Sequence, residues 1–178
     1  FDSYGMTFEN GPALPFTFSN GPGVAVDVDI DANKRDVWDL VSDINFASKF
    51  SNEFVGANWD QESPSIKIGD TFTGRNQNEH IGEWTAKCTI DAIELGRLFG
   101  WCTGDISSPG ARWRYELFDL GGTVRVRHRV ILGPGNSGLT RIIAKNPQEE
   151  SKIIRNRLYA LRQNMQMVLD GMKSSLED

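Results

Sequence analysis

The sequence predicts an α+β domain in which a curved antiparallel sheet of seven strands wraps around one long C-terminal helix. Three observations carry this prediction: an alternating strand at 24–30, six further strand segments separated by short turns, and an amphipathic stretch at 146–176. Two short helices are expected between the first strand and the rest. Because the sheet and the helix each have one apolar side, packing them against each other is the economical arrangement.

The C-terminal stretch predicts a single helix over residues 146–176. Asn146 suits the N-cap, Pro147 the first helical position, and Glu149 lies three residues after the cap, where a carboxylate can accept from free backbone amides. Apolar residues recur at steps of four and three: Ile154, Leu158, Leu161, Met165, Val168, Met172 and Leu176. This spacing places them on one face, which must be buried.

The first strand and the two helices after it follow from alternation and capping residues. Apolar residues alternate strictly through 24–30, which is typical of a half-buried strand. Asp31 and Asn33 offer caps for a helix over 37–41, and Asp43 opens a second short helical piece.

All segments between these helices and the C-terminal helix have strand character. The six predicted strands are 53–59, 71–77, 83–93, 98–103, 111–118 and 123–132. Short turns at 94–97 and 119–122 join neighbours, so we expect antiparallel hairpins.

Residue parity assigns the faces of the last hairpin. Pairing Asp119 with Gly122 places Trp113 opposite His128 and Tyr115 opposite Val126, on a face that is apolar apart from His128. The other face then carries arginines and Glu116, with Arg114 opposite Arg127 and Glu116 opposite Arg125. We interpret it as the solvated side of the sheet.

The preceding hairpin is treated in the same way. Pairing Glu94 with Arg97 gathers one face from Trp84, Ala86, Cys88, Ile90, Ala92, Phe99, Trp101 and Thr103. Cys88 and Cys102 then point to opposite faces, so disulfide geometry is impossible and we expect two free thiols.

Composition and charge exclude several classes of protein. The chain has 178 residues, enough for one domain, and a formal net charge of -5 from 19 basic and 24 acidic residues, which argues against nucleic-acid binding. No apolar run is long enough to span a membrane and no signal-peptide pattern is present. We expect a cytoplasmic protein with no cofactor, and no metal site, since only two histidines and two cysteines are available.

The start of the chain differs from the remainder. Residues 1–22 are rich in Gly, Pro, Asn and Phe, so we assign them to an N-terminal arm or an expression remnant and assign 23–178 to the domain. Since the first residue is Phe1, we expect that the sequence either begins inside a longer chain or carries an expression remnant.

Six segments together resemble one known family. They are 29–32 (DIDA), 37–43 (VWDLVSD), 56–59 (GANW), 68–76 (IGDTFTGRN), 113–117 (WRYEL) and the pair Asn164-Met165. They are similar to the polyketide cyclase/dehydrase and lipid-transport family of the START-like, or SRPBCC, helix-grip superfamily. The resemblance implies a cavity for an apolar small molecule between the sheet and the C-terminal helix, and it leaves the chemistry open.

The candidate site residues lie on the predicted inner face. His128 and Tyr115 are the candidate catalytic pair, because a histidine of near-neutral pKa beside a phenol suits acid/base work on a ketone. The alternative for His128 is a hydrogen-bonded core histidine. The candidate ligand-binding residues are Trp84, Cys88, Phe99, Trp101, Trp113, Tyr115, His128, Leu158, Leu161 and Met165. Asn76 and Asn58 are expected at the rim, and 139–145 forms a short lid near the mouth.

Three functions compete. The first is binding of an apolar, cyclic or aromatic, polyketide-like or lipid-like molecule; the second is a polyketide cyclase or dehydratase; the third is a ligand-free protein-interaction domain, and a homodimer is possible for each. The motif GxGxxG at 133–138 is rejected as a dinucleotide site because it follows an antiparallel strand. An apolar cavity favours binding, a filled interior favours interaction, and hydrogen-bonded His128 and Tyr115 facing the cavity favour the enzyme.

Overall fold

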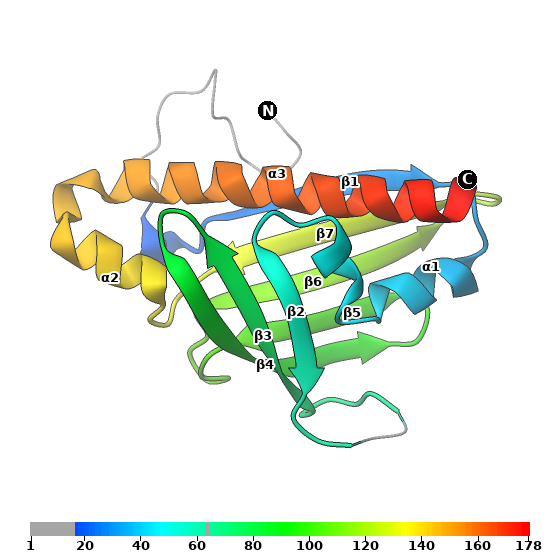
Figure 1. Ribbon diagram of the computed structural model, residues 1–178, viewed down its shortest axis with the longest axis horizontal. Coiled ribbons are helices and arrows are strands. Elements are labelled where there is room, and N and C mark those ends of the chain that lie inside the picture. Colours follow the sequence, from blue (N-terminus) through cyan, green and yellow to red (C-terminus); the bar gives the residue numbers. More distant parts are fainter. Residues whose placement is uncertain (1–16, 63–64) are drawn as a thin grey trace.

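The computed structural model describes residues 17–62 and 65–178 and shows the predicted order of elements (Figure 1). Its helices and strands are η1 (Phe18–Asn20), β1 (Gly23–Ile30), α1 (Lys34–Val41), η2 (Phe46–Lys49), β2 (Phe54–Trp59), β3 (Thr71–Asn78), β4 (Gly82–Glu94), β5 (Leu98–Thr103), β6 (Ala111–Asp119), β7 (Val124–Leu132), α2 (Gly138–Lys145), η3 (Pro147–Glu149) and α3 (Glu150–Glu177).

The strands form one seven-stranded antiparallel sheet in the order β1-β7-β6-β5-β4-β3-β2. α3 lies along the sheet and packs mainly against β1, with α2 beside its first turns and α1 near its last turns (Figure 1). The sheet curves around this helix, and the core lies between them. The predicted α+β architecture, with a curved sheet gripping the C-terminal helix, is confirmed.

α3 buries the face that its spacing predicts. Its buried side chains are Ile154, Leu158, Leu161, Met165, Val168, Leu169 and Met172, while Leu176 is half-buried. The start differs slightly from the prediction, because Asn146 precedes the 3-10 turn η3 and its side chain makes no capping hydrogen bond. The chain therefore enters α3 through a tight turn that begins at Pro147.

The predicted register of the β6–β7 hairpin is wrong by two residues. Asp119 pairs with Val124, so Tyr115 lies opposite His128 and Trp113 opposite Val130. The connection is longer than predicted: Leu120 donates its N–H to the Thr123 carbonyl across two glycines. A shift of two keeps each side chain on its predicted face, because side chains alternate with a period of two.

The β4–β5 hairpin contains a register shift that the sequence does not predict. The register shifts between Ile90 and Ala92, so Ile93, not Ala92, lies opposite Phe99. Beyond the shift Cys88 pairs with Thr103, and Cys102 pairs with Thr89. The two cysteines are free, buried and on opposite faces, as predicted.

The arginines lie on the outer face of the sheet, where they form ion pairs with carboxylates. Ion pairs join Arg127 to Asp27 at 2.9 Å and Arg125 to Asp29 at 2.8 Å, both across β1 and β7. The predicted partners on β6 are wrong in detail, since Arg114 lies opposite Arg129 and Glu116 opposite Arg127. These pairs are half-exposed and contribute modestly to stability.

Residues 1–16 of the predicted N-terminal arm lie outside the described residues. Phe18, from the end of that arm, is buried, and its backbone N–H donates to Glu150 Oε2 at 2.7 Å. The packed core therefore includes at least one residue before position 23.

Candidate functional site

A cavity of about 570 Å³ lies between the inner face of the sheet, α2 and α3. This volume falls in the range of small-molecule sites. All predicted ligand-binding residues except Leu158 line it: Trp84, Cys88, Phe99, Trp101, Trp113, Tyr115, His128, Leu161 and Met165. Leu158 is fully buried in the core and is not part of the lining, so this one prediction is corrected.

Aromatic rings form the wall of the cavity along β5 and β6. Trp101 and Trp113, cross-strand neighbours, stack with centroids 6.1 Å apart and an interplanar angle of 8°. Phe72 and Phe99 meet Trp101 edge-on at 6.0 Å and 5.8 Å. Both tryptophans stay half-buried, so a flat ligand has ring surface to contact.

His128 is the polar exception on this wall. It is 5% exposed, and neither Nδ1 nor Nε2 has a hydrogen-bond partner in the described part of the chain. Its ring stacks on Tyr115 with centroids 3.8 Å apart and an interplanar angle of 30°. A buried polar group normally has a partner, so these nitrogens call for an explanation.

The protonation of the pair differs from the prediction. Burial lowers the pKa of His128 from 6.5 to about 3 and raises the pKa of Tyr115. At neutral pH His128 is therefore an uncharged imidazole, which can donate one hydrogen bond and accept another. It is a poor base in this state, and no hydrogen bond links it to Tyr115.

Polar side chains line the cavity where α3 meets β3 and the residue before β2. Arg157 pairs with Glu53 through two hydrogen bonds of 2.8 Å and 2.5 Å, and Asn78 also donates to Glu53. Asn76 lines the cavity as predicted, whereas Asn58 is exposed and absent from the lining. The sequence does not predict Glu53 and Arg157 as site residues, because no local pattern links residues that are 104 positions apart.

α2 covers one end of the cavity. Leu139, Arg141 and Ile142 belong to the lining, and α2 has no fully buried residue. The predicted lid segment at 139–145 is therefore a short helix that contributes to the cavity lining. Ser137 and Thr140 begin it with a capping box.

Cys88 lines the cavity with a buried thiol. Burial raises the pKa of its thiol to about 12, so the reactive thiolate is scarce at neutral pH. Its Sγ makes a weak contact of 3.7 Å with the Ala86 carbonyl. Cys88 therefore acts as a small apolar lining residue.

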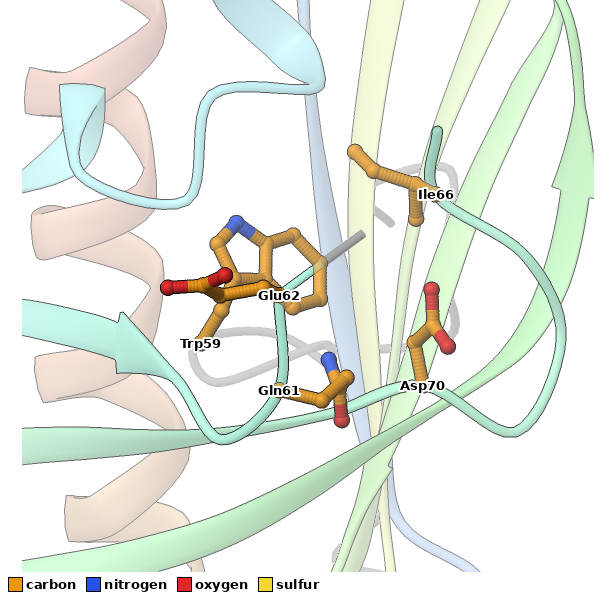
Figure 2. Close-up of a pocket in the computed structure, with 5 residues that line it drawn as sticks. All are labelled: Trp59, Gln61, Glu62, Ile66 and Asp70. Atoms are coloured by element: carbon orange, nitrogen blue, oxygen red, sulfur yellow. The ribbon is translucent and has the colours of Figure 1, made fainter. Parts of the chain in front are cut away.

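A second pocket, of about 380 Å³, lies at the connection between β2 and β3 (Figure 2). It is lined by Trp59, Gln61, Glu62, Ile66 and Asp70. Gln61 is bonded to the Thr71 backbone, and Asp70 accepts from the Lys67 N–H. These two polar groups serve the connection itself, so the larger cavity is the better candidate site.

Two further findings concern the described residues. Within 17–62 and 65–178, no three His, Cys, Asp or Glu side chains gather where they would hold a metal ion. No helix in that part of the chain is both long and apolar enough to cross a membrane.

Comparison with known proteins finds similarity at the level of structure. No family model matches the sequence, and no curated protein matches it. The polyketide cyclase-like protein Cgl2372 from Corynebacterium glutamicum superposes with a TM-score of 0.62 and 24% identity, over 87% of this chain and 91% of that one.

Two aromatase/cyclases superpose similarly. Zhui from Streptomyces sp. R1128 has a TM-score of 0.59 and 12% identity, over 88% of this chain and 93% of that one. The di-domain protein BexL from the BE-7585A biosynthetic pathway has a TM-score of 0.63 and 16% identity, over 88% of this chain and 50% of that one.

These superpositions extend over most of this chain, 87% to 88% of its residues. Identities this low establish the fold and leave the activity open. The chain shares its fold, a curved antiparallel sheet that grips a long C-terminal helix, with a polyketide cyclase-like protein and with aromatase/cyclase domains.

Proposed function

We propose that this protein binds an apolar, cyclic or aromatic small molecule, polyketide-like or lipid-like, in the cavity between the sheet and α3. The observation that carries the proposal is a 570 Å³ cavity with an aromatic wall and a buried imidazole that has no partner in the described residues. The rings supply apolar and stacking surface, and the imidazole supplies one oriented hydrogen bond. A ligand oxygen at His128 would satisfy this group.

Catalysis is the second candidate, and the observation in its favour is that His128 and Tyr115 face the same cavity as a stacked pair. Against it, the pKa of His128 lies near 3, far below the value that suits a general base at neutral pH. The pair also lacks the mutual hydrogen bond expected of the enzyme. The geometry therefore supports binding more than turnover. The cavity also disfavours the ligand-free interaction domain, for which a filled interior is expected.

A cavity-filling variant tests the proposal. Ala86 lines the cavity on β4, so Ala86→Phe inserts a ring into the space that the ligand would occupy. Thr89→Phe adds the same ring on the outer face of the same strand and is the matched control. Binding of a hydroxyanthraquinone is followed by tryptophan fluorescence and calorimetry, together with native mass spectrometry for a co-purified compound.

We expect binding by the wild type and by Thr89→Phe, and at least a tenfold loss for Ala86→Phe. Equal affinity for the hydroxyanthraquinone in all three proteins would mean that it binds outside the cavity and would contradict the proposal. Conversion of a poly-β-ketone mimic by the wild type, lost in both His128→Gln and Tyr115→Phe, would favour the cyclase instead. A cytoplasmic location and a homodimer stay predictions.

A further inference from the structure

Another polar side chain of the cavity, Asn76, lies on a different strand from His128. Asn76 is on the inner face of β3, between Phe54 on β2 and Trp84 on β4. It is half-buried, and within the described residues its side-chain amide makes no hydrogen bond. An amide offers two donors and an acceptor, so Asn76 has unused capacity that faces the cavity.

The neighbouring polar side chains are already engaged. Glu53 and Arg157 bond each other, Asn78 bonds Glu53, and Asn164 accepts from the Asn52 N–H and donates to the Ala160 carbonyl. These bonds join α3 to the residues just before β2, and join Glu53 in turn to Asn78 on β3. Asn76 is thus available to a ligand without loss of a contact that the fold uses.

His128 and Asn76 lie well apart on the curved sheet. β7 and β3 are separated by β6, β5 and β4, which is about 19 Å across a flat sheet at about 4.8 Å per strand. The curvature around α3 brings the two walls closer, and mostly apolar side chains line the space between them, among them Trp101, Trp113 and Met165. One compact polar group cannot serve both sites.

We propose that the cavity selects an elongated apolar molecule with a hydrogen-bonding oxygen at each end, one bonded by His128 and the other by Asn76. This inference rests on the proposed function and specifies its ligand class. The apolar body covers the tryptophans, and the two oxygens satisfy the imidazole and the amide. A molecule with one oxygen leaves a polar group of the wall without a partner, which costs affinity.

A matched pair of probes tests the inference: decanediol, with a hydroxyl at each end, and decanol, with one. Both chains are flexible and adapt to the span between the walls. Affinities are measured by calorimetry and by displacement of a fluorescent dye. Because the diol is also more soluble in water, the quantity compared is the ratio of the two affinities across variants, in which the solubility difference cancels.

The variants are Asn76→Leu and His128→Leu, with Asn58→Leu as the matched control. Asn58 is the same residue type on the neighbouring strand β2, exposed and outside the lining. We expect the diol-to-decanol affinity ratio to fall about 3- to 10-fold in both cavity variants, the effect of one hydrogen bond, and to stay unchanged in Asn58→Leu.

The outcomes separate this inference from the proposed function. If decanol and the diol bind with the same ratio in the wild type and in all three variants, the two-ended ligand is wrong while the binding cavity stands. If neither probe nor the hydroxyanthraquinone binds the wild type, the proposed function itself fails. Circular dichroism checks that each variant is folded.

Discussion

His128 is a buried imidazole whose two nitrogens have no partner in the described chain, beside a phenol that stacks on it without a hydrogen bond. The sequence predicts the inner face correctly, because parity along β7 alternates whatever the exact register. It does not predict the low pKa of His128. That value follows from burial of the imidazole, and burial depends on packing between segments that are distant in the sequence.

The low pKa predicts a dependence of stability on pH. The unfolded chain protonates His128 as the pH falls below 6.5, whereas the folded protein protonates it only near pH 3. Its stabilising contribution is therefore fully present above pH 6.5 and declines through this window, by about 1.4 kcal/mol per pH unit for one group.

Urea denaturation between pH 7 and pH 4 measures this effect. We expect the free energy of unfolding to fall less steeply with decreasing pH in His128→Gln than in the wild type, because Gln does not titrate. Carboxylates contribute equally to the slope in both proteins. His80→Gln, at an exposed histidine, is the control and should keep the wild-type slope. Parallel curves for wild type and His128→Gln would contradict the buried neutral imidazole.

At the scale of elements, the sequence predicts strand segments and the buried face of α3 well, because alternation and steps of three and four are local signals. It predicts pairing less well. The β6–β7 register is set by a loop that runs to Val124, and the β4–β5 register shifts between Ile90 and Ala92. Loop geometry and bulges depend on backbone conformations that side-chain alternation does not report.

Two leucines of α3 distinguish packed core from cavity wall. Leu158 is fully buried outside the cavity, and Leu161, almost one turn later, lines it. Leu158→Ala should lower the free energy of unfolding by about 2 to 5 kcal/mol, since it creates a new void. Leu161→Ala enlarges an existing space, so we expect a smaller loss and a change in ligand affinity. Equal losses in chemical denaturation, with affinity unchanged, would indicate a solid core.

Gly171 of α3 packs against Phe50, the residue that follows η2. A Cβ at this position would lie 2.4 Å from the Phe50 ring. Gly to Ala in a helix normally stabilises by up to about 1 kcal/mol, but here the ring must move. Gly171→Ala should therefore lower the melting temperature, whereas Gly138→Ala in α2, where a Cβ meets nothing within 4 Å, should not. A higher melting temperature for Gly171→Ala would show that Phe50 relocates freely.

At the scale of the whole molecule, α3 is bonded near both edges of the sheet. Lys173 Nζ donates to the Asp29 carbonyl on β1 at 2.7 Å, and Arg157 pairs with Glu53 immediately before β2. These contacts join residues 144 and 104 positions apart. Arg157 and Glu53 also line the cavity. No sequence pattern predicts either contact, because each partner alone is an ordinary charged residue.

The Arg157–Glu53 pair should therefore matter more than an exposed ion pair. Its side chains are 22% and 12% exposed, against 41% and 47% for Arg125–Asp29. A double-mutant cycle with Glu53→Gln and Arg157→Met should give a coupling energy of about 1 to 3 kcal/mol in urea denaturation, and the cycle at Arg125 and Asp29 less than about 1 kcal/mol.

The same variants test whether this pair encloses the cavity. If it does, either single change should also speed dissociation of the bound dye in stopped-flow measurements, because the β2–β3 wall is no longer held against α3. The cycle at Arg125 and Asp29 changes the outer face and should leave dissociation unaltered. A large coupling energy with unchanged dissociation would make the pair a stability contact alone, and ligand exchange would then have to pass through another boundary, with α2 the next element to test.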